Sequence, residues 1–231
     1  MSALTLKKLI SCSSLSFLVI LFFVRCQTEP KANVILFDGQ TMNAWEAWTP
    51  ETGRIAPDSV YQVSDKMIRM MGTDNGGYLI SKESFENFEL TLSYRWNPDA
   101  VENRTHPLNS GVMYRVPDKA PDSWFPKGIQ FQIKEGSTGD FILLKEATMK
   151  IAGKVYGPGQ SVLVPSNKLY GGALGEWNQL RVVAIGGHIK QFLNGKLICE
   201  GTDCSVLSGH ILLCYERSPI DFKDIILSKL N

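Results

Sequence analysis

The stretch FELTLSYRW, residues 88–96, shows the clearest alternation of apolar and polar side chains in the chain. Every second residue from Phe88 to Trp96 is apolar or aromatic, and the residues between them are polar or charged. Successive side chains of a β-strand point to opposite faces of a sheet, so this period of two predicts a strand with one buried face. Such a strand buries its apolar face against a second sheet, which indicates a β-sandwich.

Short segments of the same kind, separated by turn residues, fill the rest of the chain. Gly186-Gly187 and Asn194-Gly195 are dipeptides typical of two-residue hairpin turns, and they divide residues 177–200 into a three-stranded meander. No segment has a convincing helical period. We therefore predict an all-β fold, an antiparallel β-sandwich or jelly roll.

Length and charge limit the classes of protein to consider. The chain has 231 residues, enough for one larger domain with a substantial core. Its 24 basic and 23 acidic residues give a formal net charge of +1. This balance favours neither nucleic acid nor an anionic membrane surface as a partner.

The N-terminal segment has the pattern of an export signal. Lys7 and Lys8 precede the apolar run LSFLVILFFV, residues 15–24, which is too short to span a bilayer. Cys26 follows the run directly, as the lipid-attachment cysteine of a bacterial lipoprotein does. Arg25 departs from that pattern, because a small residue normally precedes the cysteine. Simple cleavage of the signal and an uncleaved anchor are the alternatives.

These features predict a domain organisation and a location. Residues 1–26 form a signal peptide of the lipoprotein type, residues 27–33 a tether, and residues 34–231 a single β-sandwich domain. The folded part then lies in the periplasm or at the cell surface, anchored to the outer membrane. The lipid anchor is the only membrane contact expected.

The five cysteines show no metal-binding spacing. In an exported protein, Cys199 and Cys204 either pair across the short loop between them or remain free thiols. Cys214 stands among apolar residues and is predicted to be a buried free thiol.

Aromatic residues are numerous, with five tryptophans. Trp45 and Trp48 are expected in a loop that ends at Pro50. Trp124 also lies in a predicted loop, and exposing its indole without a purpose would be costly. An indole face suits the C–H face of a sugar ring, whereas the alternative is a loop packed over the edge of the sheet.

Residues 109–140 combine strand alternation with an unusual set of polar side chains. The polar positions of the two predicted strands carry large hydrogen-bonding groups, and aromatic residues flank them. Such a face suits a polyol better than a phosphate, and its alternative is an ordinary solvated face. The polar residues concerned are Arg115, Gln130, Gln132, Glu135 and Asp140, and the flanking aromatic residues are Tyr114, Trp124 and Phe125.

Carboxylates are the main reactive groups, because the chain lacks the nucleophile, phosphate-loop and zinc motifs of common enzyme families. Glu135 and Asp140 flank the loop after the second of these strands, and Glu216 ends another strand. Two carboxylates across a cleft can act as acid and base on a glycoside. Alternatively, Gln132, Glu135 and Asp140 can hold a hard cation such as Ca²⁺, or each carboxylate forms a surface salt bridge.

No catalytic role is predicted for the three histidines or for Asp221. His188 and His210 begin strands and are predicted to be structural or solvated. His106 lies in the polar loop before Asn109 and is expected at the rim of a binding site. Asp221 is expected to face solvent.

The order and spacing of several motifs resemble one family, that of the 3-keto-disaccharide hydrolase domain, from residue 34 to residue 230. The motifs are Leu36-Phe37-Asp38-Gly39-Gln40-Thr41 with Trp45, Phe85-x-x-Phe88-Glu89-Leu90, Asn109-Ser110-Gly111, Tyr114-Arg115, Gly139-Asp140-Phe141, Gly175-Glu176-Trp177-Asn178, Asn194-Gly195 and Glu216-x-x-Pro219-Ile220-x-Phe222-x-x-Ile225.

This resemblance implies a concanavalin A-like β-sandwich with a carbohydrate on its concave face. It also implies cleavage of glycosides that carry a ketone at C3, by proton abstraction beside the ketone or by acid/base hydrolysis. A divalent cation, Ca²⁺ or Mn²⁺, would polarise the ketone. Family members usually carry Glu at the position of Gln130, so this chain departs from the pattern there.

These implications assign roles to the candidate residues. Glu135 is predicted to be the base or a metal ligand, with Gln132 and Arg115 as the other catalytic residues. The predicted substrate-binding residues are His106, Asn109, Tyr114, Trp124, Gln130 and Asp140. Because of Gln130, the alternative is a lectin-like carbohydrate-binding protein without activity, and a structural cell-surface lipoprotein is a third reading.

Overall fold

The computed structural model describes residues 33–70, 76–103, 105–166 and 173–231, all of them within the compact unit Lys31–Asn231. The expectations for the signal peptide, for Cys26 and for most of the tether lie outside the described residues. Within the ranges given above, no helix has the length and apolar character needed to cross a membrane.

The described residues form a sandwich of two antiparallel sheets with eight strands each. The first sheet contains β1 (Asn33–Phe37), β4 (Gln62–Ser64), β5 (Met67–Met70), β7 (Phe88–Trp96), β14 (Asn178–Ile185), β15 (His188–Leu193), β16 (Lys196–Gly201) and β18 (Ile220–Lys229). Their order is β16-β15-β14-β7-β18-β5-β4, and β1 pairs with β18.

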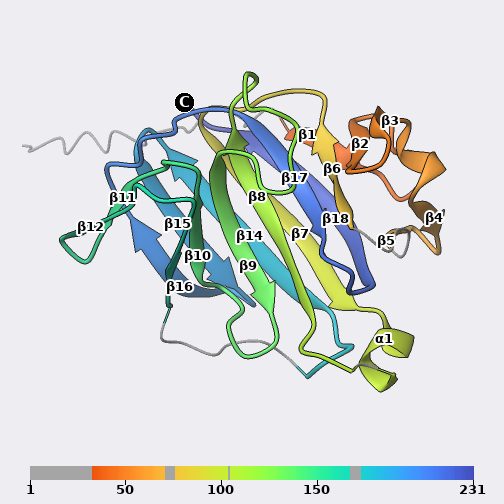
Figure 1. The fold of residues 1–231 in the computed structure, drawn as a ribbon. Helices are drawn as coiled ribbons and strands as arrows, with labels where there is room; N and C mark the ends of the chain where they lie inside the picture. The colour runs from red at the N-terminus through yellow and green to blue at the C-terminus, as the bar shows by residue number, and fades with distance from the viewer. Residues whose placement is uncertain (1–32, 71–75, 104, 167–172) are drawn as a thin grey trace, which may run out of the picture. The chain divides into compact units, whose positions relative to one another are not determined.

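The second sheet contains β2 (Trp45–Thr49), β3 (Gly53–Ile55), β6 (Gly77–Ser81), β8 (Asn109–Val116), β9 (Gly128–Lys134), β10 (Phe141–Leu144), β13 (Ser161–Val164) and β17 (His210–Tyr215). Their order is β13-β10-β9-β8-β17-β6-β2-β3. Figure 1 shows β8, β9 and β10 of this sheet lying over β7, β14 and β15 of the first.

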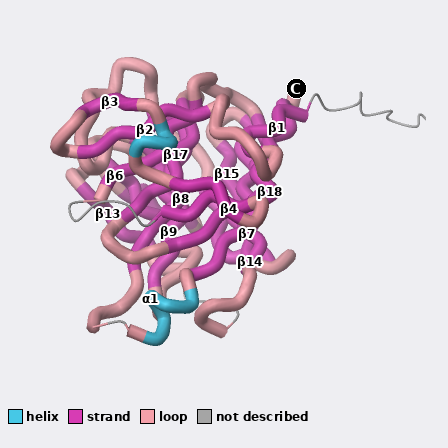
Figure 2. The backbone as a smooth tube through the Cα atoms, turned by 90° about the vertical axis from the view of Figure 1, so that its right-hand side faces the viewer, coloured by secondary structure: helices cyan, strands magenta, loops and turns pink. Residues whose placement is uncertain are grey.

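Three small elements complete the described part of the chain. A hairpin of β11 (Met149–Ile151) and β12 (Lys154–Tyr156) forms a separate two-stranded sheet, and a bridge between Lys150 and Thr202 joins it to the segment after β16. The short helix α1 (Pro98–Glu102) and the 3-10 turn η1 (Pro57–Ser59) lie in connections, with η1 beside β2 (Figure 2).

The core lies between the two sheets, as the alternation of residues 88–96 predicts. In β7 every second side chain is buried, from Phe88 to Trp96, and β7 lies between β14 and β18. The facing strand β9 contributes Ile129, Phe131 and Ile133, which are fully buried in the same cluster. The antiparallel β-sandwich predicted from the sequence is confirmed.

The expected loop around Trp45 and Trp48 is wrong, because both residues belong to β2, which pairs with β6. Trp45 is fully buried in the core, where its indole N–H donates to the carbonyl of Leu36 over 2.7 Å. Trp48 instead stacks on Tyr78, with ring centroids 4.9 Å apart, in a second apolar cluster. A spacing of three residues places the two indoles on opposite faces, so no period of two appears in the sequence.

Asp221 differs from expectation, and the structure decides between the two alternatives left open for Cys199 and Cys204. Cys199 and Cys204 are both buried and form no disulfide in the described part of the chain, and the Cys204 Sγ donates to the carbonyl of Val206 over 3.3 Å. Asp221 is fully buried rather than solvated, because Arg95 covers it with an Nε–Oδ2 distance of 3.0 Å. Cys214 is a buried free thiol, as predicted.

Candidate functional site

Several of the polar residues that the sequence predicts to bind a ligand lie on three neighbouring strands, β9, β8 and β17. Since Ile129, Phe131 and Ile133 point into the core, Gln130 and Gln132 of β9 lie on the outer face of the second sheet. Asn109 begins β8, and Glu216 follows the last residue of β17. The strand order therefore brings these four residues side by side.

A directed chain of hydrogen bonds joins the four residues. The Gln130 Nε2 donates to the Gln132 Oε1 over 2.6 Å, and the Gln132 Nε2 donates to the Asn109 Oδ1 over 3.2 Å. The Asn109 Nδ2 in turn donates to the Glu216 Oε2. Each amide N–H₂ group thus donates to the next residue in the direction of Glu216. The Asn109 amide orients the Glu216 carboxylate, and Gln132 and Gln130 orient Asn109 in turn.

The backbone around Asn109 supports this arrangement. Its N–H donates to the Ser218 Oγ over 3.1 Å, and the neighbouring Ser110 Oγ donates to the carbonyl of Cys214 over 2.8 Å. Both bonds tie the start of β8 to the segment that carries Glu216. The Asn-Ser-Gly motif therefore holds the two strand ends together.

Burial changes the chemistry of Glu216. Desolvation raises the pKa of Glu216 from 4.5 to about 7, although the nearby amides of Gln130 and Asn109 and the charge of Lys134 act in the opposite direction. Its Oε1 atom and the Gln130 Oε1 atom are buried and have no hydrogen-bond partner among the described residues. A buried carboxylate with a pKa near neutrality and an unsatisfied oxygen is suited to exchange a proton with a ligand.

A pocket of about 400 Å³ opens beside this carboxylate. Its lining consists of Asn109, Trp124, Phe125, Glu216 and Arg217. The rings of Trp124 and Phe125 lie 5.8 Å apart and are inclined by 34°. The pocket thus combines an aromatic wall, one carboxylate and one guanidinium group, which is a combination that can hold a polar ring with apolar faces.

Trp124 is held against the sheet by a close approach to Gly76. A Cβ atom built on Gly76 would lie 1.9 Å from the Trp124 Cη2 and 2.8 Å from its Cζ3. Only a residue without a side chain leaves room for the indole there, and Gly76 also has a φ of +81°. The indole is half-buried in this position.

The loop that carries Trp124, residues 117–127, is fastened to the sheet by side-chain contacts. Asp122 pairs with Arg54 at 2.8 Å, and Ser123 accepts from the Lys145 Nζ at 2.8 Å. Near the start of the loop, Asp118 lies 2.9 Å from the Nε2 of His210. These contacts keep the aromatic wall next to Glu216.

Beneath and beside this loop, the outer face of the sheet is apolar and buried. The second apolar cluster consists of Trp48, Tyr78, Ile80, Met113, Val116, Ile142, Leu144, Leu212 and Cys214. This apolar surface lies next to the polar residues around Asn109 and Glu216.

Four of the sequence-predicted residues meet at this site. Asn109, Gln130 and Gln132 belong to the hydrogen-bond chain, and Trp124 lines the pocket. His106 is exposed in the loop before β8, three residues from Asn109. A role for His106 at the rim stays a prediction.

Tyr114 and Arg115 do not lie with this group, contrary to expectation. The Tyr114 hydroxyl donates to the Gln191 Oε1 over 2.8 Å in the core between the sheets. Arg115 is fully buried, with a φ of +54°, and donates to the carbonyls of Val206 (3.0 Å) and Glu86 (3.3 Å). The ladder between β8 and β17 shifts register here, and this bulge turns the Arg115 side chain away from the outer face.

Asp140 and Glu135 also stand outside the hydrogen-bond chain. The Asp140 Oδ1 accepts from the backbone N–H of Ser166 over 2.7 Å, and the carboxylate is buried. Glu135 follows the end of β9 and is half-buried, with its backbone N–H bonded to Leu108. A catalytic role for Glu135 stays a prediction.

The ligands of the predicted cation site, Gln132, Glu135 and Asp140, lie on β9 and in the loop after it. Within the described ranges, no three His, Cys, Asp or Glu side chains come together as metal ligands. The Gln132 Oε1 is already an acceptor for Gln130, and the Asp140 Oδ1 is already an acceptor for Ser166. A Ca²⁺ or Mn²⁺ site at Gln132, Glu135 and Asp140 stays a prediction.

Sequence reasoning did not assign Glu216 and Arg217 to the site. Glu216 was noted only as a carboxylate at the end of a strand and as part of a motif that also contains Pro219. Its separation from Asn109 is 107 residues, so only the pairing of β8 with β17 brings them together. The motif that begins with Glu216 is the feature of the sequence that points to this carboxylate as a site residue.

Solved structures with the same fold are associated with carbohydrates. A protein from Parabacteroides distasonis assigned as a glycosyl hydrolase superimposes with a TM-score of 0.60 at 17% identity, covering 86% of this chain and 94% of that one. A carbohydrate-binding module from Bacillus subtilis has a TM-score of 0.55 at 13% identity and covers 80% and 96%. Comparison with curated proteins gave no match.

An enzyme from Clostridium perfringens, a GlcNAcα1-4Gal-releasing endo-β-galactosidase, also shares the fold. Its TM-score is 0.57 at 10% identity, and the alignment covers 85% of this chain and 61% of that one. These likenesses show that the chain shares its β-sandwich fold with proteins that bind or cleave carbohydrates. More particularly, the chain belongs to the family of the 3-keto-alpha-glucoside-1,2-lyase-like domain, which matches residues 33–228.

Proposed function

We propose that this protein cleaves glycosides that carry a ketone at C3, with Glu216 as the base that removes the proton from C2. The carrying observation is the Glu216 carboxylate, which lines the pocket and keeps Oε1 without a hydrogen-bond partner among the described residues. Family membership supports the substrate class.

The chemistry needs only one group that both accepts and returns a proton. A ketone at C3 acidifies the hydrogen at C2, so a carboxylate can remove it. The electron pair of the C2–H bond forms the C2=C3 bond of an enolate, which places negative charge on the C3 oxygen. When the C3 carbonyl re-forms, this electron pair forms the C1=C2 double bond and the bond from C1 to the leaving oxygen breaks. Glu216 then returns its proton to that oxygen, and water adds across the double bond to complete a net hydrolysis.

The environment of Glu216 matches this task. A pKa of about 7 for Glu216 means that both protonation states are populated near neutral pH, so one residue can serve in both directions. Asn109 holds the carboxylate through its Nδ2, and Gln132 and Gln130 hold Asn109 in turn. The amides are positioning residues in this proposal.

Two other lining residues complete the site. Among the described residues that line the pocket, Arg217 carries the positive charge. Its guanidinium group would stabilise negative charge on the C3 oxygen as the enolate forms. Trp124 and Phe125 would pack on the C–H faces of the sugar ring.

A second candidate function is carbohydrate binding without cleavage. It is favoured by Gln130, which replaces the Glu usual in the family and leaves Glu216 as the single carboxylate of the hydrogen-bond chain. Under this function, Glu216 accepts a hydrogen bond from a sugar hydroxyl.

A comparison of two carboxylate variants separates these functions. The purified mature protein is incubated with p-nitrophenyl 3-keto-α-D-glucoside, and released products are followed by chromatography. Glu216→Gln should abolish release while binding of the substrate persists, whereas Glu135→Gln should leave release unchanged. Loss of release in Glu135→Gln alone would restore Glu135 as the base. No release by the unmodified protein, with saturable binding, would establish the binding function instead.

We also propose that the protein is exported and lipidated at Cys26. Lys7, Lys8 and the apolar residues 15–24 have the order of a secretory signal, and Cys26 follows them directly. Metabolic labelling with palmitate should mark the protein, and Cys26→Ser should remove the label. Labelling that survives this substitution would contradict the assignment.

A further inference from the structure

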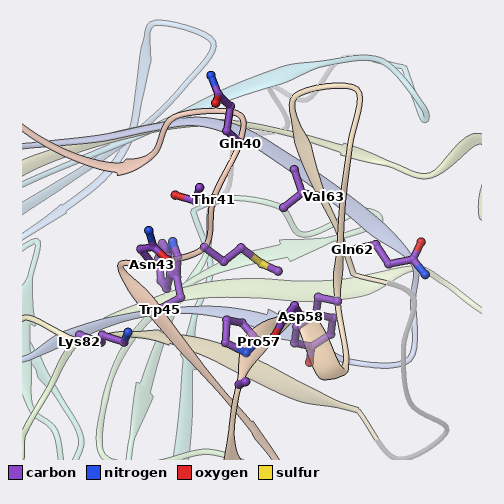
Figure 3. Close-up of a pocket in the computed structure, with 12 residues that line it drawn as sticks. Gln40, Thr41, Asn43, Trp45, Pro57, Asp58, Gln62, Val63 and Lys82 are labelled. Atoms are coloured by element: carbon purple, nitrogen blue, oxygen red, sulfur yellow. The ribbon is translucent and has the colours of Figure 1, made fainter.

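A second pocket, of about 650 Å³, lies away from Glu216. Figure 3 shows its residues coming from the segment after β1, from η1 and from β4, with Lys82 entering after β6. Trp45 pairs with Ser81 at one end of β6, whereas Gly77 pairs with Tyr215, next to Glu216, at the other. Four residues of strand, roughly 13 Å, separate the two ends.

The first wall of this pocket is the Leu36-Phe37-Asp38-Gly39-Gln40-Thr41 motif, which the proposed function does not use. The Asp38 Oδ1 accepts from the backbone N–H groups of Gln40 (2.8 Å) and Thr41 (3.0 Å) and so fixes the turn. Trp45 anchors the far end of the segment through its bond to the carbonyl of Leu36. The wall is therefore formed before any ligand arrives.

The lining chemistry is that of a site for a neutral, hydroxyl-rich molecule. Amide and hydroxyl side chains surround the pocket, and they form no side-chain hydrogen bond with any residue in the described ranges. They are Gln40, Thr41, Asn43 and Gln62. Apolar surface from Met42, Trp45, Pro57, Tyr61 and Val63 completes the lining. Amides beside aromatic and aliphatic surface can bond hydroxyls and pack on C–H faces at once.

The charges that line the pocket favour a neutral ligand. Asp58 and Lys82 are the charged residues that line the pocket, and their formal charges cancel. A phosphate or a polyanion would find no net attraction there. The volume lies within the range of roughly 300–1,000 Å³ that small-molecule sites occupy.

We propose that this pocket is a second saccharide site, which binds a neutral sugar of one or two rings. The site is independent of the cleavage proposed for Glu216. It would keep the protein on a glycan while the other pocket acts.

The test uses sugars without a ketone, so that it does not depend on cleavage. Binding of glucose, mannose, galactose, sucrose and trehalose to the mature protein is measured by calorimetry. The double substitution Asn43→Ala and Gln62→Ala should lower the affinity for the bound sugar at least tenfold. Trp124→Ala should leave this affinity unchanged. Because Asn43 and Gln62 are exposed, the thermal midpoint should not change.

Release from 3-keto-glucoside, measured on the same double variant, should equal that of the unmodified protein. A second variant, Ala56→Trp, fills the pocket from the exposed residue before η1 and should also remove binding. Affinity lost in Trp124→Ala but kept in the pocket variants would overturn the proposal, as would the absence of binding by every sugar of the panel.

Discussion

The amide of Gln130 lies directly over Gly111 of the neighbouring strand. A Cβ atom at position 111 would be 2.5 Å from both the Cδ and the Nε2 of Gln130. Gln130 is only 3% exposed, so its side chain has little room to withdraw. The glycine of the Asn-Ser-Gly motif therefore makes space for the first amide of the chain that ends at Glu216.

Replacing Gly111 with alanine should displace this amide and break its bond to Gln132. Overpacking of this kind typically costs about 1–3 kcal/mol, and we expect a decrease of that size in the free energy of unfolding, measured with urea. Release from 3-keto-glucoside should fall as well. The double variant Gly111→Ala with Gln130→Ala should regain stability without regaining activity. A single variant as stable and active as the unmodified protein would show that the contact does not matter.

The raised pKa of Glu216 predicts how stability depends on pH. At low pH the carboxyl is protonated in both states and contributes no difference. As pH rises from 4.5 to about 7, the unfolded state releases its proton first, so the folded state loses stability. The Glu216→Gln variant should thus be more stable than the unmodified protein at about pH 8, by up to about 3 kcal/mol, and equal to it at about pH 4.

Urea unfolding at the two pH values checks this expectation, with Glu135→Gln as the matched carboxylate control. A Glu216→Gln variant that is destabilised at high pH would mean that the ionised carboxylate is satisfied in the folded protein. The same variant is expected to be inactive, so stability and function oppose each other at this residue.

A carboxylate at position 130 should move the pH dependence of activity. In the Gln130→Glu variant, two carboxylates would share the buried site, and repulsion raises the pKa of Glu216 further. The ascending limb of kcat/KM, expected near pH 7 from the pKa of Glu216, should shift to higher pH in this variant. The neutral variant Gln130→Met removes the amide of Gln130 without adding a charge, so it should shift the limb in the same direction by a smaller amount. An identical profile in Gln130→Glu would indicate that another group is the base.

The sandwich could be predicted from sequence because β7 is buried on one face only and pairs with β14 and β18 along its length. Its period of two is consequently intact from end to end. β2 was missed because Trp45 and Trp48 serve different apolar clusters on opposite faces. A strand that is buried on both sides shows no alternation.

The site could be predicted in part for the same reason. Gln130 and Gln132 are two residues apart in one strand, so their shared face follows from the sequence alone. Glu216 comes from a strand far along the chain, and only the order β9-β8-β17 shows that it completes the group. Tyr114 and Arg115 were misplaced because a bulge has no signature in an alternating stretch.

Trp124 should contribute affinity rather than catalysis. An aromatic contact is worth about 0.5–1.5 kcal/mol, so Trp124→Ala should raise KM for the 3-keto-glucoside up to about tenfold with kcat nearly unchanged. Trp177→Ala is the matched control, because Trp177 packs against Arg95 and Lys223 of the first sheet, away from the pocket. Steady-state kinetics of both variants distinguish the two tryptophans. A fall in kcat without a change in KM for Trp124→Ala would instead place the indole beside the reacting atoms, where it excludes water from the C2 proton transfer.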